Sequence, residues 1–110
     1  MSNDNSDVIA VATLIPAPGK AAELDEALRI AVRGAQREPG CRRYALHQAV
    51  RGVEGLVIIE HWESAEALAE HGRGEAFTAL AAQFENLLAE PMHVVVLEPT
   101  PEGDPHLGRL

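Results

Sequence analysis

The sequence has little of several residue types, and each shortage excludes a class of protein. Among its 110 residues there is one cysteine, Cys41, so no disulfide can form within the chain and a cytoplasmic location is expected. Nine basic residues stand against seventeen acidic ones, and the net charge of −8 disfavours binding to nucleic acid or to anionic lipid. No apolar run approaches the roughly 20 residues of a membrane span, and the polar first residues predict no signal peptide.

Aromatic residues are also scarce, at 4% of the chain. A core must therefore be built from Ala, Val, Leu and Ile, which supply most of the 46% of hydrophobic residues. The length predicts a single domain with one core. The few aromatic side chains then stand out as candidates for a site or for core anchors: Tyr44, Trp62, Phe77 and Phe84.

Hydrophobic periodicity divides the chain into alternating strands and helices. Apolar runs predict strands at 8–15, 41–50, 56–62 and 93–97. A helical stripe follows Lys20 and is stopped by Pro39-Gly40. A second helix is expected from Ala65, after an N-cap at Ser64, with a break at 72–74 and a continuation from about Glu75 to Pro91. The domain is predicted to span 8–98, between a polar tail at 1–7 and an irregular tail at 99–110.

The order βαββαβ predicts an α+β, ferredoxin-like fold with an antiparallel sheet. Two helices can cover only one face of such a sheet. A strand with one face in water should alternate apolar and polar residues, whereas VIAVATLI, LVII and VVVL are apolar at consecutive positions. We therefore expect a homodimer in which a second copy covers the open face of the sheet, because two-fold dimers are the commonest oligomers.

Three stretches, taken together, resemble the antibiotic biosynthesis monooxygenase family. The first is Pro18-Gly19-Lys20, before the first helix. The second is the helix-to-strand passage EPGCRRYALH at 38–47. The third is EHWES at 60–64, followed by Ala67-Leu68, His71 and Phe77. The resemblance covers about residues 8–98 and implies a dimeric α/β barrel.

The resemblance implies several possible activities. Some members of the family oxygenate quinols or aromatic polyketides without metal or flavin, and others degrade heme. The heme-degrading pattern has an Asn on the first strand and a Trp in the second helical region, and this chain has neither at 8–15 or 65–88. The sequence thus favours a cofactor-independent monooxygenase that acts on a quinol or polycyclic phenol and O₂. The alternatives are a binding or sensing protein without turnover, and an isomerase of a small hydroxy-ketone.

His71 and Glu60 are the candidate catalytic residues. His71 matches the family pattern and has a side chain suited to proton transfer near neutral pH, although a histidine at a helix end can also bind exposed carbonyls. Glu60 is a carboxylate within an apolar strand, so it must be paired or hydrogen-bonded, or have a raised pKa. It is either structural or a hydrogen-bonding partner in the cleft.

Four further residues are candidate substrate contacts. Trp62 and Phe77 would form apolar walls, unless they are core residues. Tyr44 would donate a hydrogen bond. His47 belongs to the family-like stretch, but strand alternation places it in a row with Cys41, Arg43 and Ala45, on the face opposite Tyr44.

No cofactor or metal site is predicted. The histidines show neither HxxxH nor HxH spacing, so the evidence for a metal is weak. GxGxxG and P-loop patterns are absent, which leaves no nucleotide fingerprint.

Overall fold

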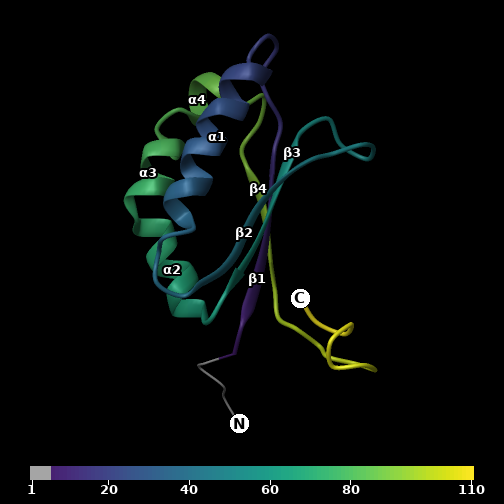
Figure 1. Cartoon of the computed structure of the whole chain (residues 1–110). Helices are drawn as coiled ribbons and strands as arrows, with labels where there is room; N and C mark the ends of the chain where they lie inside the picture. Colours follow the sequence, from purple (N-terminus) through teal and green to yellow (C-terminus); the bar gives the residue numbers. More distant parts are fainter. Residues whose placement is uncertain (1–5) are drawn as a thin grey trace.

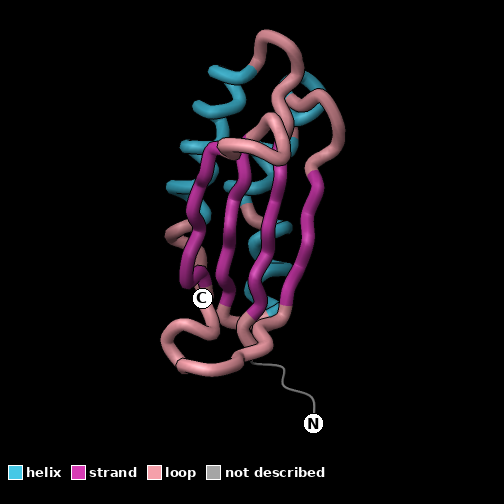
Figure 2. Tube along the Cα trace, turned by 90° about the vertical axis from the view of Figure 1, so that its right-hand side faces the viewer, coloured by secondary structure: helices cyan, strands magenta, loops and turns pink. Residues whose placement is uncertain are grey.

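The computed structural model describes residues 6–110 and shows one antiparallel sheet with helices on one side (Figure 1). The predicted tail at 1–7 therefore lies mostly outside the described residues. The strands pair in the order β2-β3-β1-β4, side by side in Figure 2. In chain order the elements are β1 (Val8–Leu14), α1 (Ala21–Ala35), β2 (Cys41–Gln48), β3 (Leu56–Trp62), α2 (Ala65–Arg73), α3 (Glu75–Ala81), α4 (Phe84–Leu87) and β4 (His93–Leu97). This is the predicted ferredoxin-like fold.

The core lies between the helices and the sheet. In α1 the buried positions Leu24, Leu28 and Ala31 recur at helical spacing and face the sheet. On the sheet, alternate residues of each strand point to the helices, as Ala12 and Leu14 do from β1. Figure 1 shows all the helices on the same side of the sheet. The opposite side is the open face.

The second helical region differs from the predicted helix that runs to Pro91. It breaks at Gly74, as expected, but the helix then ends at Ala81 and only the short α4 follows. The chain at and after the end of α4 pairs instead with the residues that follow β1. Ala17 N–H donates to the Leu87 carbonyl at 2.8 Å, and Ala89 N–H donates to the Ile15 carbonyl at 2.8 Å. These tertiary hydrogen bonds satisfy the backbone groups that a longer helix would have used.

One strand also corrects the expected side-chain directions. A β-bulge lies between Cys41 and Arg43, so that Cys41 is opposite Trp62 while Arg43 is opposite His61. An extra residue in one strand shifts every side chain beyond it to the other face. Cys41 therefore packs against the core on the helix side. The prediction that it shares a face with Arg43, Ala45 and His47 is wrong.

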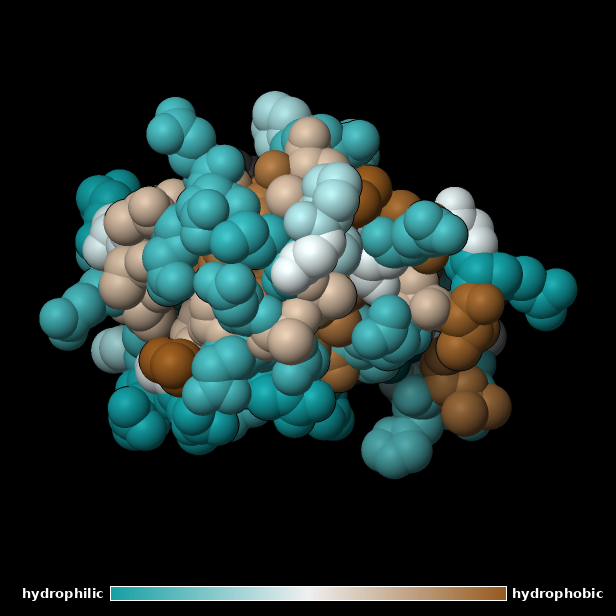
Figure 3. Space-filling view, turned by 90° about the horizontal axis from the view of Figure 1, so that it is seen from above, coloured by the Kyte–Doolittle hydropathy of each residue, from teal (hydrophilic) through white to brown (hydrophobic). Residues whose placement is uncertain are grey.

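The open face carries an apolar row across the sheet. The register places Ala45, Ile59, Val11 and Val95 side by side, one from each strand. Seen from above, strongly hydrophobic atoms gather more toward the side of the sheet than toward the helices (Figure 3). Val95 and Leu97 are 41% and 45% exposed, which is a large fraction for apolar residues in the middle and at the end of a strand.

The C-terminal residues, 98–110, contain neither helix nor strand and lie away from the helices, in yellow in Figure 1. Their Arg109 reaches Asp7 (Nη2 to Oδ2, 3.4 Å), and Asp7 also contacts His61 (Oδ2 to Nε2, 2.8 Å). The hydrogen bond to His61 lowers the pKa of Asp7. Among residues 6–110 no helix has the length and hydropathy needed to span a membrane.

Candidate active site

A cavity of about 270 Å³ lies between the helices and the sheet. Most of its wall is apolar, and three polar side chains reach it from three different elements: Tyr44 from β2, Glu60 from β3 and His71 from α2. The apolar wall consists of Ala10, Ala12, Ile58, Leu68, Gly72, Phe77, Leu80, Met92, Val94 and Val96. An apolar pocket with a few convergent polar groups is the usual form of a small-molecule site.

The cavity is reached from the edge of the sheet. Val94 and Val96 of β4 line it and yet are 43% and 55% exposed. Their partners on β1, Ala12 and Ala10, are buried beneath the helices. The small Ala side chains leave the space, and the exposed valines form its boundary with solvent.

His71 occupies the polar wall of the cavity and is 6% exposed. It lies in the last turn of α2, whose start is capped by Ser64 accepting from the Ala67 N–H at 3.1 Å. Nδ1 of His71 is 2.7 Å from Oε1 of Glu38. A carboxylate can only accept, so Nδ1 carries the hydrogen and Nε2 of a neutral ring holds a lone pair. Nε2 lies on the side of Tyr44 and Glu60.

Glu60 is buried beside His71, with Oε1 4.0 Å from Nε2 of the imidazole. Trp62 donates a hydrogen bond from Nε1 to the same oxygen at 2.9 Å. Burial raises the pKa of Glu60, and this effect outweighs the lowering by the Trp62 hydrogen bond and by His71. Glu60 therefore keeps its proton to a higher pH than an exposed glutamate.

Tyr44 completes the polar wall. Its hydroxyl lies 3.4 Å from Nε2 of His71, a long contact that a ligand hydroxyl can replace. Burial, with further contributions from Glu60 and Glu38, raises the pKa of Tyr44 far above its usual value. The hydroxyl thus stays protonated and donates toward the imidazole.

The raised pKa of Glu60 predicts that the residue costs stability at neutral pH. A carboxyl group whose pKa rises on folding favours the folded state below its unfolded pKa, and this contribution is lost as the pH rises through the folded value. Glu60→Gln should therefore be more stable than wild type at pH 8, by about 1 kcal/mol, and should gain little below about pH 4, the pKa of an unfolded glutamate. Urea unfolding at the two pH values measures the difference.

Glu85→Gln is the matched control, because Glu85 is exposed in α4 and its replacement should change the free energy of unfolding little at either pH. A Glu60→Gln protein that is less stable than wild type at pH 8 would show that the charged form of Glu60 is favoured by its surroundings.

Of the other three predicted contacts, Phe77 lines the cavity, whereas Trp62 and His47 do not. Phe77 lines the cavity, with its ring centroid 5.8 Å from that of His71. Trp62 is fully buried behind His71, 4.8 Å between ring centroids, and does not line the cavity. His47 is opposite Val57 on the open face, so the structure does not bring it to this cavity. Trp62 is thus a core residue that holds Glu60 and supports the imidazole.

Glu38 belongs to the site and was not among the predicted residues. It follows the C-terminus of α1, where the helix dipole disfavours a negative charge. An acidic residue at that point indicates a partner elsewhere in the fold, and this was the one signal in the sequence. The partner, His71, is 33 positions away, so only the tertiary structure identifies it.

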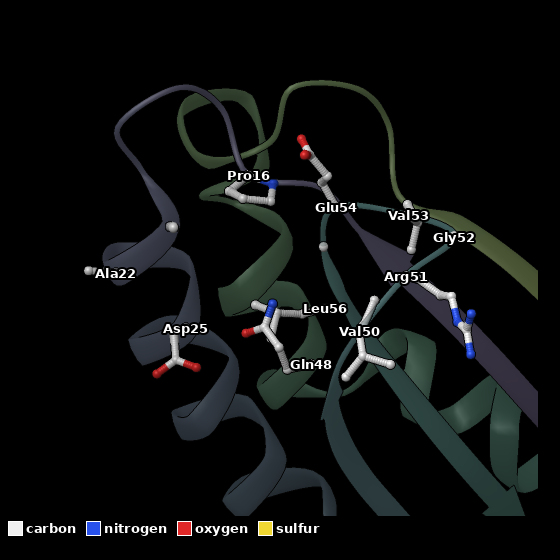
Figure 4. Close-up of a pocket in the computed structure, with 13 residues that line it drawn as sticks. Pro16, Ala22, Asp25, Gln48, Val50, Arg51, Gly52, Val53, Glu54 and Leu56 are labelled. Carbon is white, nitrogen blue, oxygen red and sulfur yellow. The ribbon is translucent and has the colours of Figure 1, made fainter.

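A wider hollow of about 990 Å³ lies at the other end of the sheet, between the β2–β3 hairpin and the start of α1 (Figure 4). Gln48, Val50 and Arg51 border it from the hairpin, and Asp25 from the helix. Its lining includes none of the buried polar side chains of the described chain, which are Glu60, His61 and His71. We therefore assign the candidate site to the smaller cavity.

Residues 6–110 contain no group of three or more His, Cys, Asp or Glu side chains placed to hold a metal ion. Cys41 is a free thiol, and burial raises its pKa. A raised pKa makes a thiol less reactive, which gives Cys41 no evident role in the cavity.

Comparison with known proteins identifies the family. The profile of the family described as "Antibiotic biosynthesis monooxygenase" matches residues 7–83. The chain belongs to this family. It is 34% identical over 98 residues to the monooxygenase-like protein Rv0793 of Mycobacterium tuberculosis, which covers 89% of this chain and 96% of that protein. The family-matched region includes Glu38, Tyr44, Glu60, His71 and Phe77.

Solved structures of the family have the same fold. The structure of Rv0793 matches with a TM-score of 0.83 and 32% identity, over 90% of this chain and 100% of that one. PA3566 from Pseudomonas aeruginosa matches with a TM-score of 0.78 and 30% identity, over 88% and 97% of the two chains. The resemblance inferred from the sequence motifs and the ferredoxin-like fold predicted from the order of the elements are both confirmed.

Proposed function

We propose that this family member is a cofactor-independent monooxygenase of a small quinol or phenol, which it binds in the 270 Å³ cavity. The observation that carries the proposal is the convergence of His71, Glu60 and Tyr44 on one wall of an otherwise apolar pocket. Such a wall suits a planar, largely apolar molecule that turns one hydroxyl group toward His71.

The size of the cavity narrows the substrate. An engineered apolar cavity of roughly 150 Å³ accommodates benzene. A cavity of about 270 Å³ therefore suits one ring, or two fused rings with small substituents. This favours a quinol of that size over a polycyclic phenol with three or more rings.

His71 acts first, as the general base. Its Nε2 lone pair faces the cavity, because Nδ1–H is engaged by Glu38. A substrate hydroxyl that displaces the Tyr44 contact gives its proton to Nε2, and the substrate becomes a phenolate. Phenolates transfer electrons to O₂ far more readily than phenols do, so the substrate supplies the reducing electrons. With a quinol, a C–O bond then forms to O₂, the resulting peroxide anion takes a proton back from Nε2 of His71, and loss of water from the hydroperoxide gives a hydroxylated quinone.

Tyr44 and Glu60 stabilise the charge that develops on the substrate. Both have a raised pKa because they are buried, and each can donate a hydrogen bond in its protonated form. Donors fixed in a site with little water stabilise an anion more strongly than water does. The apolar wall, which includes Phe77, also limits access of water to the hydroperoxide.

The test is O₂ consumption by metal-free protein with a panel of one-ring and two-ring hydroquinones. We expect saturable uptake of one O₂ per quinol, above the uncatalysed rate, with at least one compound of the panel. Tight, saturable binding of a panel member without O₂ uptake would indicate that the protein binds the compound and is not a monooxygenase. Failure to bind any phenol would contradict both functions.

We also propose that the protein is a homodimer joined through the open face. Four apolar side chains cross the middle of that face, and none of the described helices covers it. A second copy presents the same row after a two-fold rotation, so the interface is self-complementary. The cavity lies on the other side of the sheet, which leaves its entrance at β4 available to substrate.

A further inference from the structure

Glu38 is held rigidly between α1 and β2. Its N–H donates to the Ala35 carbonyl at 3.0 Å, and its carbonyl accepts from the Cys41 N–H at 3.2 Å. Between them, Pro39 has a fixed φ and Gly40 has φ of +83°, in the left-handed region that favours glycine. The backbone on both sides of Glu38 is therefore fixed, and its side chain is directed at α2.

Gly74 makes room for the carboxylate. A Cβ atom at position 74 would lie 3.0 Å from Oε2 of Glu38, tighter than nearly all contacts that real Cβ atoms make. The glycine at the end of α2 thus allows Glu38 to approach the helix end, where Oε1 meets Nδ1 of His71 at 2.7 Å.

His71 separates two spaces. One is the 270 Å³ cavity, and the other is an outer groove of about 480 Å³, lined by Glu38, Pro39, Glu63, Ser64, Glu66, Ala67, Glu70, His71 and Gly74. Exposure increases along this path, from the His71 side chain at 6% to the Glu38 side chain at 20%. The imidazole therefore has Nε2 on the cavity side and Nδ1 on the groove side.

We infer that Glu38 positions His71 and conducts its proton to the outer groove, an inference that rests on the proposed function. When the substrate O–H bond breaks, an Nε2–H bond forms. The Nδ1–H bond then breaks, and the proton passes to Oε1 of Glu38 and on to water in the groove. The imidazole then gives its Nε2 hydrogen to the peroxide anion that forms from O₂, and Glu38 returns a proton from the groove to Nδ1, which restores the starting tautomer. The proton on Nδ1 thus leaves and re-enters through the groove, without crossing the entrance at β4.

The charges around His71 support this direction of transfer. Glu60 of β3 and Tyr44 of β2 face Nε2, and Glu38 faces Nδ1. In the groove, Glu63, Glu66 and Glu70 add three more acidic side chains, and His71 is the one basic residue of the lining; Arg73, outside the lining, pairs with Glu70 at 3.0 Å. A cleft lined by one sign of charge attracts the opposite sign, so the groove favours the arrival and release of a proton.

The variant Glu38→Gln tests whether Glu38 positions His71 and takes its proton, or only holds α2 in place. The glutamine has the same shape, but its amide can either accept from Nδ1–H or donate to Nδ1. In ¹⁵N NMR spectra of the unliganded protein, wild-type His71 should be the neutral Nδ1–H tautomer, and Glu38→Gln should populate the Nε2–H tautomer. This readout does not depend on turnover.

The kinetic arm measures proton transfer. We expect kcat of Glu38→Gln to fall about 10- to 100-fold, the usual cost of removing an outer partner of a functional histidine, while KM changes less than threefold. Added formate should restore part of kcat in Glu38→Ala. Glu85→Gln is the control, because Glu85 is exposed in α4 and lines neither the cavity nor the groove, and it should keep wild-type kcat and tautomer. Glu38→Asp controls for folding, since it retains a carboxylate.

The outcomes distinguish this inference from the proposed function. If wild type oxygenates a quinol and Glu38→Gln retains both its kcat and the Nδ1–H tautomer, the inference is wrong and the function stands. If no quinol is oxygenated, the function is wrong, and the NMR arm still decides whether Glu38 sets the tautomer. A wild-type His71 that is mainly the Nε2–H tautomer overturns the inference in either case.

Discussion

Replacement of His71 by asparagine is expected to lower kcat for quinol oxygenation by about 10²- to 10⁴-fold, the range typical of a lost general base. Asparagine keeps a polar group that can still reach Glu38, but it has no lone pair basic enough to take a phenol proton. Binding of a non-reactive phenol should change only a few fold, because the apolar wall of the cavity is unaltered. Steady-state O₂ uptake and a binding titration measure the two quantities separately.

His106→Asn provides the control, since His106 is exposed in the C-terminal segment and lies outside the cavity lining. It should leave kcat unchanged. Thermal unfolding must show that both variants fold. If a folded His71→Asn protein retains kcat within threefold of wild type, His71 is not the general base. Glu60 would then be the next candidate for that role.

A negative charge at the centre of the open face should dissociate the proposed dimer. Val11 lies between Ile59 and Val95 in the apolar row, and Glu at this position would place two carboxylates near each other across a two-fold interface. Burying an unpaired charge costs several kcal/mol, which is enough to shift a micromolar dimer largely to monomer. Light scattering should give twice the 11.8 kDa chain mass for wild type and the single mass for Val11→Glu.

Ile30→Glu is the matched control. Ile30 is an exposed apolar residue of α1, on the side of the sheet opposite the open face, so its replacement should leave the dimer intact. Val95→Glu, near the edge of the open face, provides a second test if Val11→Glu does not fold. A wild-type protein that is monomeric at high micromolar concentration would contradict the dimer.

The sequence predicted the parts of the fold that depend on local pattern. Short apolar runs bounded by turn residues placed β3 and β4 at their observed bounds and the other two strands to within two residues. Gly74 and Ser64 marked the ends of α2. Glycine interrupts a helix because its backbone is flexible, and the serine side chain caps the first turn.

The parts that were missed depend on tertiary contacts. The bulge that turns Cys41 toward the core is set by pairing with β3. The helix that was expected to reach Pro91 ends early because residues 87 and 89 bond to residues 15 and 17. Trp62 was a possible wall of the site, but its fully buried position behind His71 follows from packing. The contact of Glu38 with His71 joins two loop-adjacent positions that no periodicity connects.

The central claim, that the cavity beside His71 oxygenates a small quinol, is tested most directly by isotope labelling. Metal-free protein would be incubated with ¹⁸O₂ and the best-bound hydroquinone, and the product analysed by mass spectrometry, with His71→Asn as the background. We expect wild type to form a hydroxylated quinone with one ¹⁸O atom from O₂. His71→Asn should form this product only at the background rate. An unlabelled quinone, or equal labelling by the two proteins, would contradict it.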